Sequence, residues 1–130
     1  MSGGGQVGLK SVYMRGGTSR ALFFHTDDLP GSVDDRDSWA PIFAAAVGSP
    51  DPGGRQLDGL GGGISSLSKI AVIGPPTHPD ADIDYIFGQV AVQGTNVSYR
   101  GNCGNISAAV GPYAIDQGLV EVSDGEALVR

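Results

Sequence analysis

The stretch GNCGNISAAVGPYAI, residues 101–115, contains the single cysteine of a 130-residue chain, Cys103. A Gly-Asn pair stands on each side of the thiol, and a run of small and apolar residues follows. Glycine allows the backbone angles of a tight turn, and the run after it has a helical composition that Gly118 would end. The stretch predicts a helix over residues 103–117 with Cys103 at its N-terminus.

The position of Cys103 has two interpretations. Unpaired backbone N–H groups and the positive end of the helix dipole would stabilise a thiolate or a bound carboxylate, which suits an acid/base or nucleophilic thiol. A lone cysteine can equally be a small buried residue that only fills space. The residues themselves leave both interpretations open.

Short strands are predicted upstream of this helix. Residues 7–14 and 19–25 are rich in β-forming side chains and flank the turn RGGT, so they predict a hairpin. Further strands are predicted over residues 69–73, from Ile83 onward, and in the segment NVSY before the cysteine. The 22 glycines and 8 prolines are interleaved with these apolar segments, which is typical of many strands joined by tight turns.

One more helix is predicted in the first half of the chain. The segment RDSWAPIFAAAVG follows Asp34 and Asp35, either of which could cap its first turn. Pro41 is early enough to be tolerated, and Gly48 would end the helix. We expect this helix to serve packing.

Composition excludes several classes of function. The formal net charge is −6, so the clustered Lys and Arg that a sequence-independent nucleic-acid binder needs are absent. No apolar run approaches the roughly 20 residues that span a bilayer. The start MSGGGQVGLK lacks the apolar region of a signal peptide, and one cysteine cannot form an internal disulfide, so we expect a cytoplasmic protein. His25 and His78 have no second ligand at metal-binding spacing, and no metal is expected.

The loop LDGLGGGISSLSK, residues 57–69, is the second candidate site. Its glycines fit neither the dinucleotide-binding spacing nor a P-loop. The loop can still bring backbone N–H groups and serine hydroxyls close to a small polar ligand. It ends in Lys69, one of two lysines. A surface lysine is the ordinary interpretation, but at the start of an apolar strand desolvation would favour the neutral amine that a base requires.

The third candidate is the turn MRGGTSR, in which Arg15 and Arg20 flank small polar residues. Arginine binds carboxylates through two parallel hydrogen bonds, so these residues could clamp a polycarboxylate. Two exposed turn charges would look the same in the sequence. This pattern alone does not separate the two cases.

These three motifs, with DIDYIFGQV before the cysteine, together resemble the PrpF family, which includes 2-methylaconitate isomerases, methylitaconate isomerases and oxalomesaconate tautomerases. The resemblance implies an α+β, diaminopimelate-epimerase-like fold, in which a β-rich sheet or barrel wraps around a central helix, here residues 103–117. It also implies two similar domains with the active site in the cleft between them. Family members are longer, so we expect residues 1–130 to be a truncated N-terminal domain, with the second domain absent from this chain.

The resemblance further implies a cofactor-independent isomerase or tautomerase that moves a double bond by proton transfer in a small unsaturated di- or tricarboxylate. Lys69 and Cys103 would lie near the transferred proton. A thiol-based epimerase of the same fold, and an inactive fragment that only binds a partner or a carboxylate, are the alternatives. No cofactor, nucleic acid or membrane is expected as a partner, and a homodimer is left open. The expected substrate-binding residues are Arg15, Thr18, Ser19, Gly61, Gly62, Ser65, Ser66, Ser68, Asn102, Gly104 and Asn105.

Overall fold

The computed structural model describes residues 6–123 and 125–130 and begins with the predicted hairpin. Strand β1 (Val12–Gly16) pairs antiparallel with β2 (Ser19–His25), and Gly16 lies opposite Ser19. The two residues between them form the turn, where Gly17 has a φ of 53° that glycine adopts without strain. The hairpin is confirmed, although its first strand starts five residues later than the segment that we predicted from composition.

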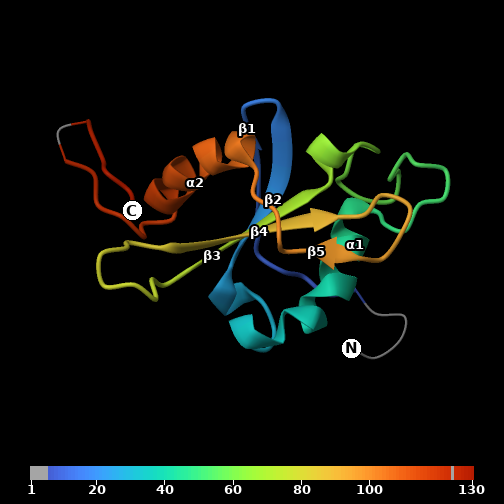
Figure 1. Ribbon diagram of the computed structural model, residues 1–130, viewed down its shortest axis with the longest axis horizontal. Helices are drawn as coiled ribbons and strands as arrows, with labels where there is room; N and C mark the ends of the chain where they lie inside the picture. The colour runs from blue at the N-terminus through green and yellow to red at the C-terminus, as the bar shows by residue number, and fades with distance from the viewer. Residues whose placement is uncertain (1–5, 124) are drawn as a thin grey trace.

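Five strands form one mixed sheet in the order β1-β2-β3-β4-β5 (Figure 1). Strands β3 (Lys69–Gly74) and β4 (Asp84–Val90) are the long strands predicted after the glycine-rich loop, and NVSY contributes only the two-residue β5 (Val97–Ser98). The pairing of β2 with β3 is parallel and the other pairings are antiparallel. The N-terminal ends of β2 and β3 therefore meet at the same end of the sheet.

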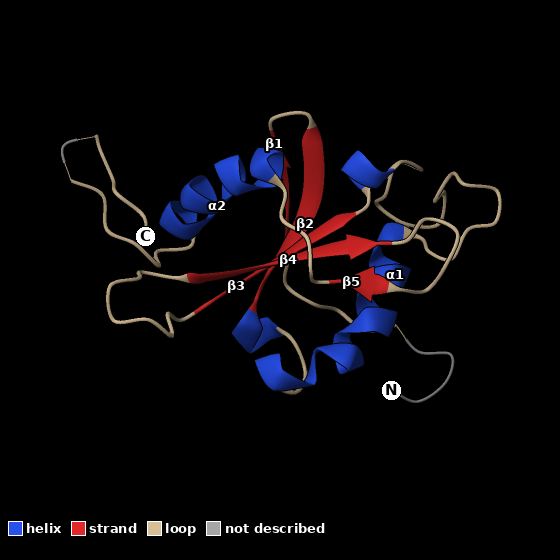
Figure 2. Cartoon of the chain, in the orientation of Figure 1, coloured by secondary structure: helices blue, strands red, loops and turns tan. Residues whose placement is uncertain are grey.

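Helix α2 (Gly104–Asp116) covers one face of the sheet, as Figure 2 shows. Phe23, Ile73 and Ile106 are wholly buried between them, and each such side chain stabilises the fold by about 1.5–3 kcal/mol. The helix begins after Cys103, runs through Pro112, and is followed by Gly118 with a φ of 72°. The predicted helix is confirmed with bounds one residue shorter at each end.

The other face is covered by a 3₁₀ segment, η2 (Val33–Trp39), and by α1 (Ala40–Val47). Pro41 lies in the first turn of α1 and Gly48 ends it with a φ of 91°, as predicted. The predicted cap by Asp34 or Asp35 is wrong, because both lie inside η2 and Trp39 precedes α1 without a side-chain cap. Burial decides the start instead, since Trp39 is 1% exposed and its indole N–H donates to Pro30 O at 2.8 Å.

Two further 3₁₀ turns, η1 (Thr26–Asp28) and η3 (Ser65–Leu67), lie at the ends of β2 and β3. The sheet is open, and strands β2 and β3 are buried on both faces. None of the helices in the described part of the chain has the length and apolar character needed to cross a membrane.

Candidate active site

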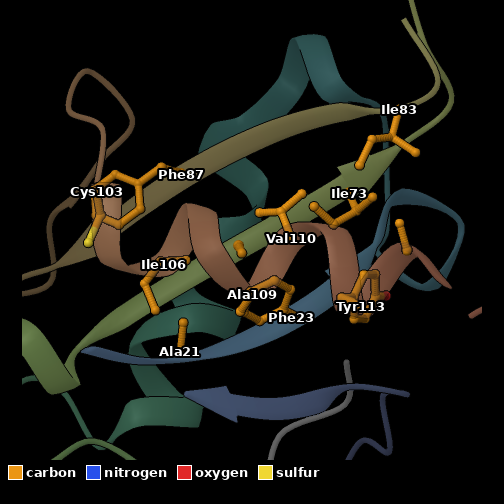
Figure 3. Close-up of a cluster of buried hydrophobic side chains, with 12 residues drawn as sticks. Ala21, Phe23, Ile73, Ile83, Phe87, Cys103, Ile106, Ala109, Val110 and Tyr113 are labelled. Atoms are coloured by element: carbon orange, nitrogen blue, oxygen red, sulfur yellow. The ribbon is translucent and has the colours of Figure 1, made fainter. Parts of the chain in front are cut away.

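The cysteine, the lysine and a serine from the three predicted motifs meet at one end of the sheet. Ser19 opens β2, Lys69 opens β3, and Cys103 is the N-cap residue of α2. Side chains alternate along a strand, so Ser19 and Lys69 lie on the same face as Ala21 and Ala71, which pack against α2. Figure 3 shows the sulfur of Cys103 at one end of this core, next to Phe87 and Ile106.

The three polar groups are within contact distance. Lys69 Nζ donates a hydrogen bond to Cys103 Sγ at 3.5 Å, and the thiol donates to Ser19 Oγ at 3.7 Å. Lys69 Nζ also lies 5.1 Å from the centroid of the Phe87 ring, whose face attracts a cation. The amine is therefore held between an aromatic ring and a sulfur.

The surroundings hold the pKa of the Cys103 thiol below its ordinary value. Burial acts in the opposite direction, because the side chain is only 8% exposed and a buried charge loses its hydration. The backbone N–H of Ile106, the Ser19 hydroxyl and the positive charge of Lys69 together outweigh burial. The site therefore stabilises the thiolate more than an ordinary setting does, as expected for a cysteine at a helix N-terminus.

The first turn of α2 is fixed by its neighbours. Asn102 Oδ1 accepts from the Cys103 N–H at 2.8 Å, and Ser107 Oγ donates to Cys103 O at 2.9 Å. Asn105 Nδ2 donates to Thr18 Oγ1 at 3.2 Å, which links the helix to the hairpin turn. Gly104, like Asn102, Asn105 and Thr18, is exposed. The structure therefore groups these predicted residues with Cys103.

The glycine-rich loop is bound more to the protein than the sequence suggests. The Gly61 N–H, expected to face a ligand, donates to Val47 O at 3.0 Å. Ser68 is wholly buried and its hydroxyl donates to Val90 O at 2.8 Å, so that hydroxyl serves the fold. Gly62 and Ser65 are exposed, and Ser66 is half-buried. This loop can offer Ser65 and Ser66 to a ligand, whereas Ser68 is left out of the site that we propose.

Arg15 lies apart from the thiol. It alternates with Met14, which packs in the core under α2, so its exposed side chain leaves β1 on the opposite face of the sheet. Tyr13 shares that face, and its hydroxyl donates to Leu60 O at 3.1 Å. The structure does not bring Arg15 together with Lys69 and Cys103.

Two residues next to the thiol and amine were missed from the sequence. Phe87 and Gln89 lie on the α2 face of β4, and Gln89 is the cross-strand partner of Lys69. Gln89 Nε2 donates to Ser65 O at 3.0 Å and to Ser68 O at 2.9 Å, and so holds η3 against the sheet. The alternation in DIDYIFGQV carried the signal, because Gln89 follows Phe87 by two positions.

Within the described ranges, no group of three or more His, Cys, Asp or Glu side chains is placed to hold a metal ion. The site is instead a thiol and an amine beside a helix N-terminus.

Comparison with known proteins shows the family of this chain. The family model described as "PrpF protein" matches residues 6–130. The chain belongs to the PrpF family. It is 45% identical to the 2-methyl-aconitate isomerase of Cupriavidus necator over 96% of this chain and 33% of that protein. It is 46% identical to the 4-oxalomesaconate tautomerase of Pseudomonas putida over 97% of this chain and 34% of that protein.

A solved structure of the family has the same fold. The crystal structure of methylitaconate-delta-isomerase superposes with a TM-score of 0.82 at 47% identity, over 89% of this chain and 29% of that one. The likeness confirms the expected α+β fold of the diaminopimelate-epimerase kind, here as an open sheet with α2 across one face. The chain spans about a third of the length of these PrpF relatives.

Proposed function

We propose that this chain provides one wall of an isomerase site, in which Lys69 and Cys103 move a proton within a small unsaturated di- or tricarboxylate. The observation that carries the proposal is the 3.5 Å contact between Lys69 Nζ and Cys103 Sγ at the N-terminus of α2. The names of the relatives indicate methylaconitate, methylitaconate or oxalomesaconate as the kind of substrate.

The reaction is a shift of a double bond with no change of oxidation state. A base removes a proton from a carbon next to a carboxylate or from its vinylogous position. The electron pair of that C–H bond then spreads into the neighbouring double bond and carboxylate as a dienolate. A proton returned at the far end of the allyl unit completes the shift. Atoms and electrons balance without a redox partner, and we propose a cofactor-independent reaction.

The residues divide this work between them. Because the pKa of Cys103 is lowered, the thiolate is suited to take the first proton. Lys69 is the donor in its contact with the sulfur, so it is placed to keep the thiolate charged and to pass a proton back. The first N–H groups of a helix have no partner within the helix. Those of Gly104 and Asn105 can therefore donate hydrogen bonds to the negatively charged oxygen of the dienolate.

We also propose that the chain is one domain of a larger protein and that the remaining wall of the cleft comes from outside residues 1–130. Cys103 lies at the end of the core, while Gly104 and Asn105 are exposed beside it. Exposure to water weakens electrostatic stabilisation of a dienolate, which needs a dry and preorganised site. The 130-residue chain alone should therefore show no measurable turnover.

The test is a chimaeric protein in which this chain replaces the matching third of the Cupriavidus necator isomerase. Turnover of 2-methylaconitate would be followed by absorbance. Lys69→Met and Cys103→Ala should each lower the rate by at least about 100-fold, the usual cost of losing an acid/base or oxyanion group. Lys10→Met, which changes the other lysine at an exposed position, is the matched control and should leave the rate unchanged.

Four outcomes would count against the proposal. Wild-type rates in the Lys69→Met chimaera would remove the lysine from the reaction, and wild-type rates in Cys103→Ala would remove the thiol. Turnover by the monodisperse 130-residue chain would show that no second wall is needed. Exchange of a stereocentre proton without movement of a double bond would assign the chain to the thiol-based epimerases instead.

A further inference from the structure

Gln56 has a backbone conformation that its side chain does not favour. Its φ is 53°, and among the described residues it is the one non-glycine with a positive φ. Residues other than glycine rarely adopt this left-handed backbone conformation, because their Cβ atom comes too close to the backbone carbonyl. Gln56 is also 1% exposed, although an amide is usually a surface group. Both features need a compensating set of contacts.

The backbone around Gln56 is fixed by one carboxylate. Asp51 accepts hydrogen bonds from the N–H groups of Gly53, Arg55 and Gln56 at 2.9, 2.9 and 2.7 Å. These bonds lower the pKa of Asp51, and that of Arg55 contributes most. The carboxylate therefore holds the turn that directs the Gln56 side chain inward.

The amide of Gln56 joins three separate segments. Its Nε2 donates to Ser49 Oγ at 3.0 Å and to Ser68 Oγ at 2.8 Å. Its Oε1 accepts from the Gly63 N–H at 2.9 Å. All of these partners are polar groups inside the protein, so the amide exchanges its lost hydration for a complete set of hydrogen bonds. Gly61 is needed nearby, because a Cβ there would collide with the same amide.

Both serine hydroxyls donate in turn to backbone carbonyls at the end of β4. Ser49 Oγ donates to Ala91 O at 2.6 Å, and Ser68 Oγ donates to Val90 O at 2.8 Å. Ser68 immediately precedes Lys69, the first residue of β3. A hydrogen bond from Gln56 to Ser68 therefore acts one peptide unit away from the lysine that contacts the thiol.

We infer that Gln56 is a positioning residue that fixes Lys69 against Cys103 through the hydroxyl of Ser68. The buried amide sets where β3 begins, and the start of β3 sets the reach of the Lys69 side chain. The inference rests on the proposed Lys69–Cys103 pair, but it concerns the geometry of that pair and not turnover. It can be tested on the 130-residue chain itself.

The test measures the rate of alkylation of the single cysteine by iodoacetamide as a function of pH. Lys69 from β3 and Tyr85 from β4 are the titratable groups that act on the thiol, with the uncharged Ser19 from β2. Burial raises the pKa of Tyr85 to about 12, so it stays neutral over the range measured. A change in the profile then reports the placement of Lys69.

Gln56→Met keeps the length of the side chain and removes its three hydrogen bonds. It should raise the midpoint of the profile by about half a pH unit, which lowers the alkylation rate near neutral pH by about threefold. Ser68→Ala should reproduce this shift. Ser49→Ala is the matched control: it removes the other acceptor of the same amide, and its midpoint should equal that of the wild type.

The outcomes separate this inference from the proposed function. An ordinary thiol profile in the wild-type chain would reject the Lys69–Cys103 pair itself. A lowered wild-type midpoint that Gln56→Met leaves unchanged would reject the positioning role alone, as would equal shifts in Ser68→Ala and Ser49→Ala. Tryptophan fluorescence of Trp39 checks that each variant is folded. If Gln56→Met does not fold, the comparison of the midpoints of Ser68→Ala and Ser49→Ala tests the positioning role. Loss of the fold in all three variants would give the amide a purely structural role.

Discussion

Replacing Gly16 with alanine should separate the hairpin from α2. A Cβ atom on Gly16 would lie 2.9 Å from Ile106 Cα and 3.0 Å from Asn105 C, and closer still to Asn105 O. All three are backbone atoms in the first turn of α2, so no side-chain rotation can make room. Either the end of β1 or the start of the helix has to move.

The size of the effect follows from the nature of these contacts. Overpacking in a filled interior costs about 1–3 kcal/mol, and the upper end applies because the obstacle is backbone. A loss of about 3 kcal/mol is a large part of the roughly 5–15 kcal/mol by which domains are stable. For a chain of this size it lowers the melting temperature by roughly 10 °C.

The matched control is Gly104→Ala, the same substitution at the first residue of α2. Apart from its chain neighbours and the backbone of its own helix, no atom lies within 4 Å of the Cβ that it adds. Alanine is favoured over glycine in a helix by up to about 1 kcal/mol, so this variant should be as stable as the wild type or slightly more so. Urea unfolding followed by the fluorescence of Trp39 measures both variants. Equal midpoints for Gly16→Ala and Gly104→Ala would refute the close approach of the hairpin to the helix.

Two other predictions concern titrating groups. Lys69→Met removes the positive charge beside the thiol, so the pKa of Cys103 should rise and alkylation near neutral pH should slow. Lys10→Met should leave the alkylation rate unchanged. Equal rates in the two variants would contradict the contact between Lys69 and Cys103. Asp51→Ala should lower the melting temperature at neutral pH. Because the folded pKa of Asp51 is depressed, its stabilisation is present above the unfolded value near 3.8 and is lost as the pH falls through the folded value. The two melting curves should therefore converge in acid, and a difference that persists there would mean that the carboxylate charge is not the cause.

The strands and α2 were predictable because their signals are local. Glycine breaks separate the apolar segments of β1 through β4, and the helix after Cys103 starts at a glycine and ends before one. The start of α1 was not predictable, since Asp34 and Asp35 are good caps in isolation. The burial of Trp39 overrides them, and burial depends on the sheet that the segment packs against.

In the candidate site, too, some features are predictable from local sequence and others depend on the folded structure. Lys69 and Cys103 are each predicted from the residues around them and are paired by the PrpF resemblance, and the structure places Lys69 Nζ 3.5 Å from Cys103 Sγ. Ser68 is predicted to bind substrate as a hydroxyl of the glycine-rich loop, and Arg15 as a carboxylate clamp, but burial directs Ser68 elsewhere and strand alternation directs Arg15 elsewhere. Gln56 gave no signal, because neither its positive φ nor its three hydrogen bonds can be read from the residues around it.

The separation in sequence of the groups around Cys103 bears on how the chain is synthesised. The thiol meets Ser19 across 84 positions and Lys69 across 34. Contacts between such distant segments form late, because each requires a long loop to close first. A ribosome exposes Ser19 and Lys69 well before Cys103 emerges. The contacts that lower the pKa of Cys103 are therefore present only in the finished fold, and a nascent or partly unfolded chain presents an ordinary cysteine to oxidants.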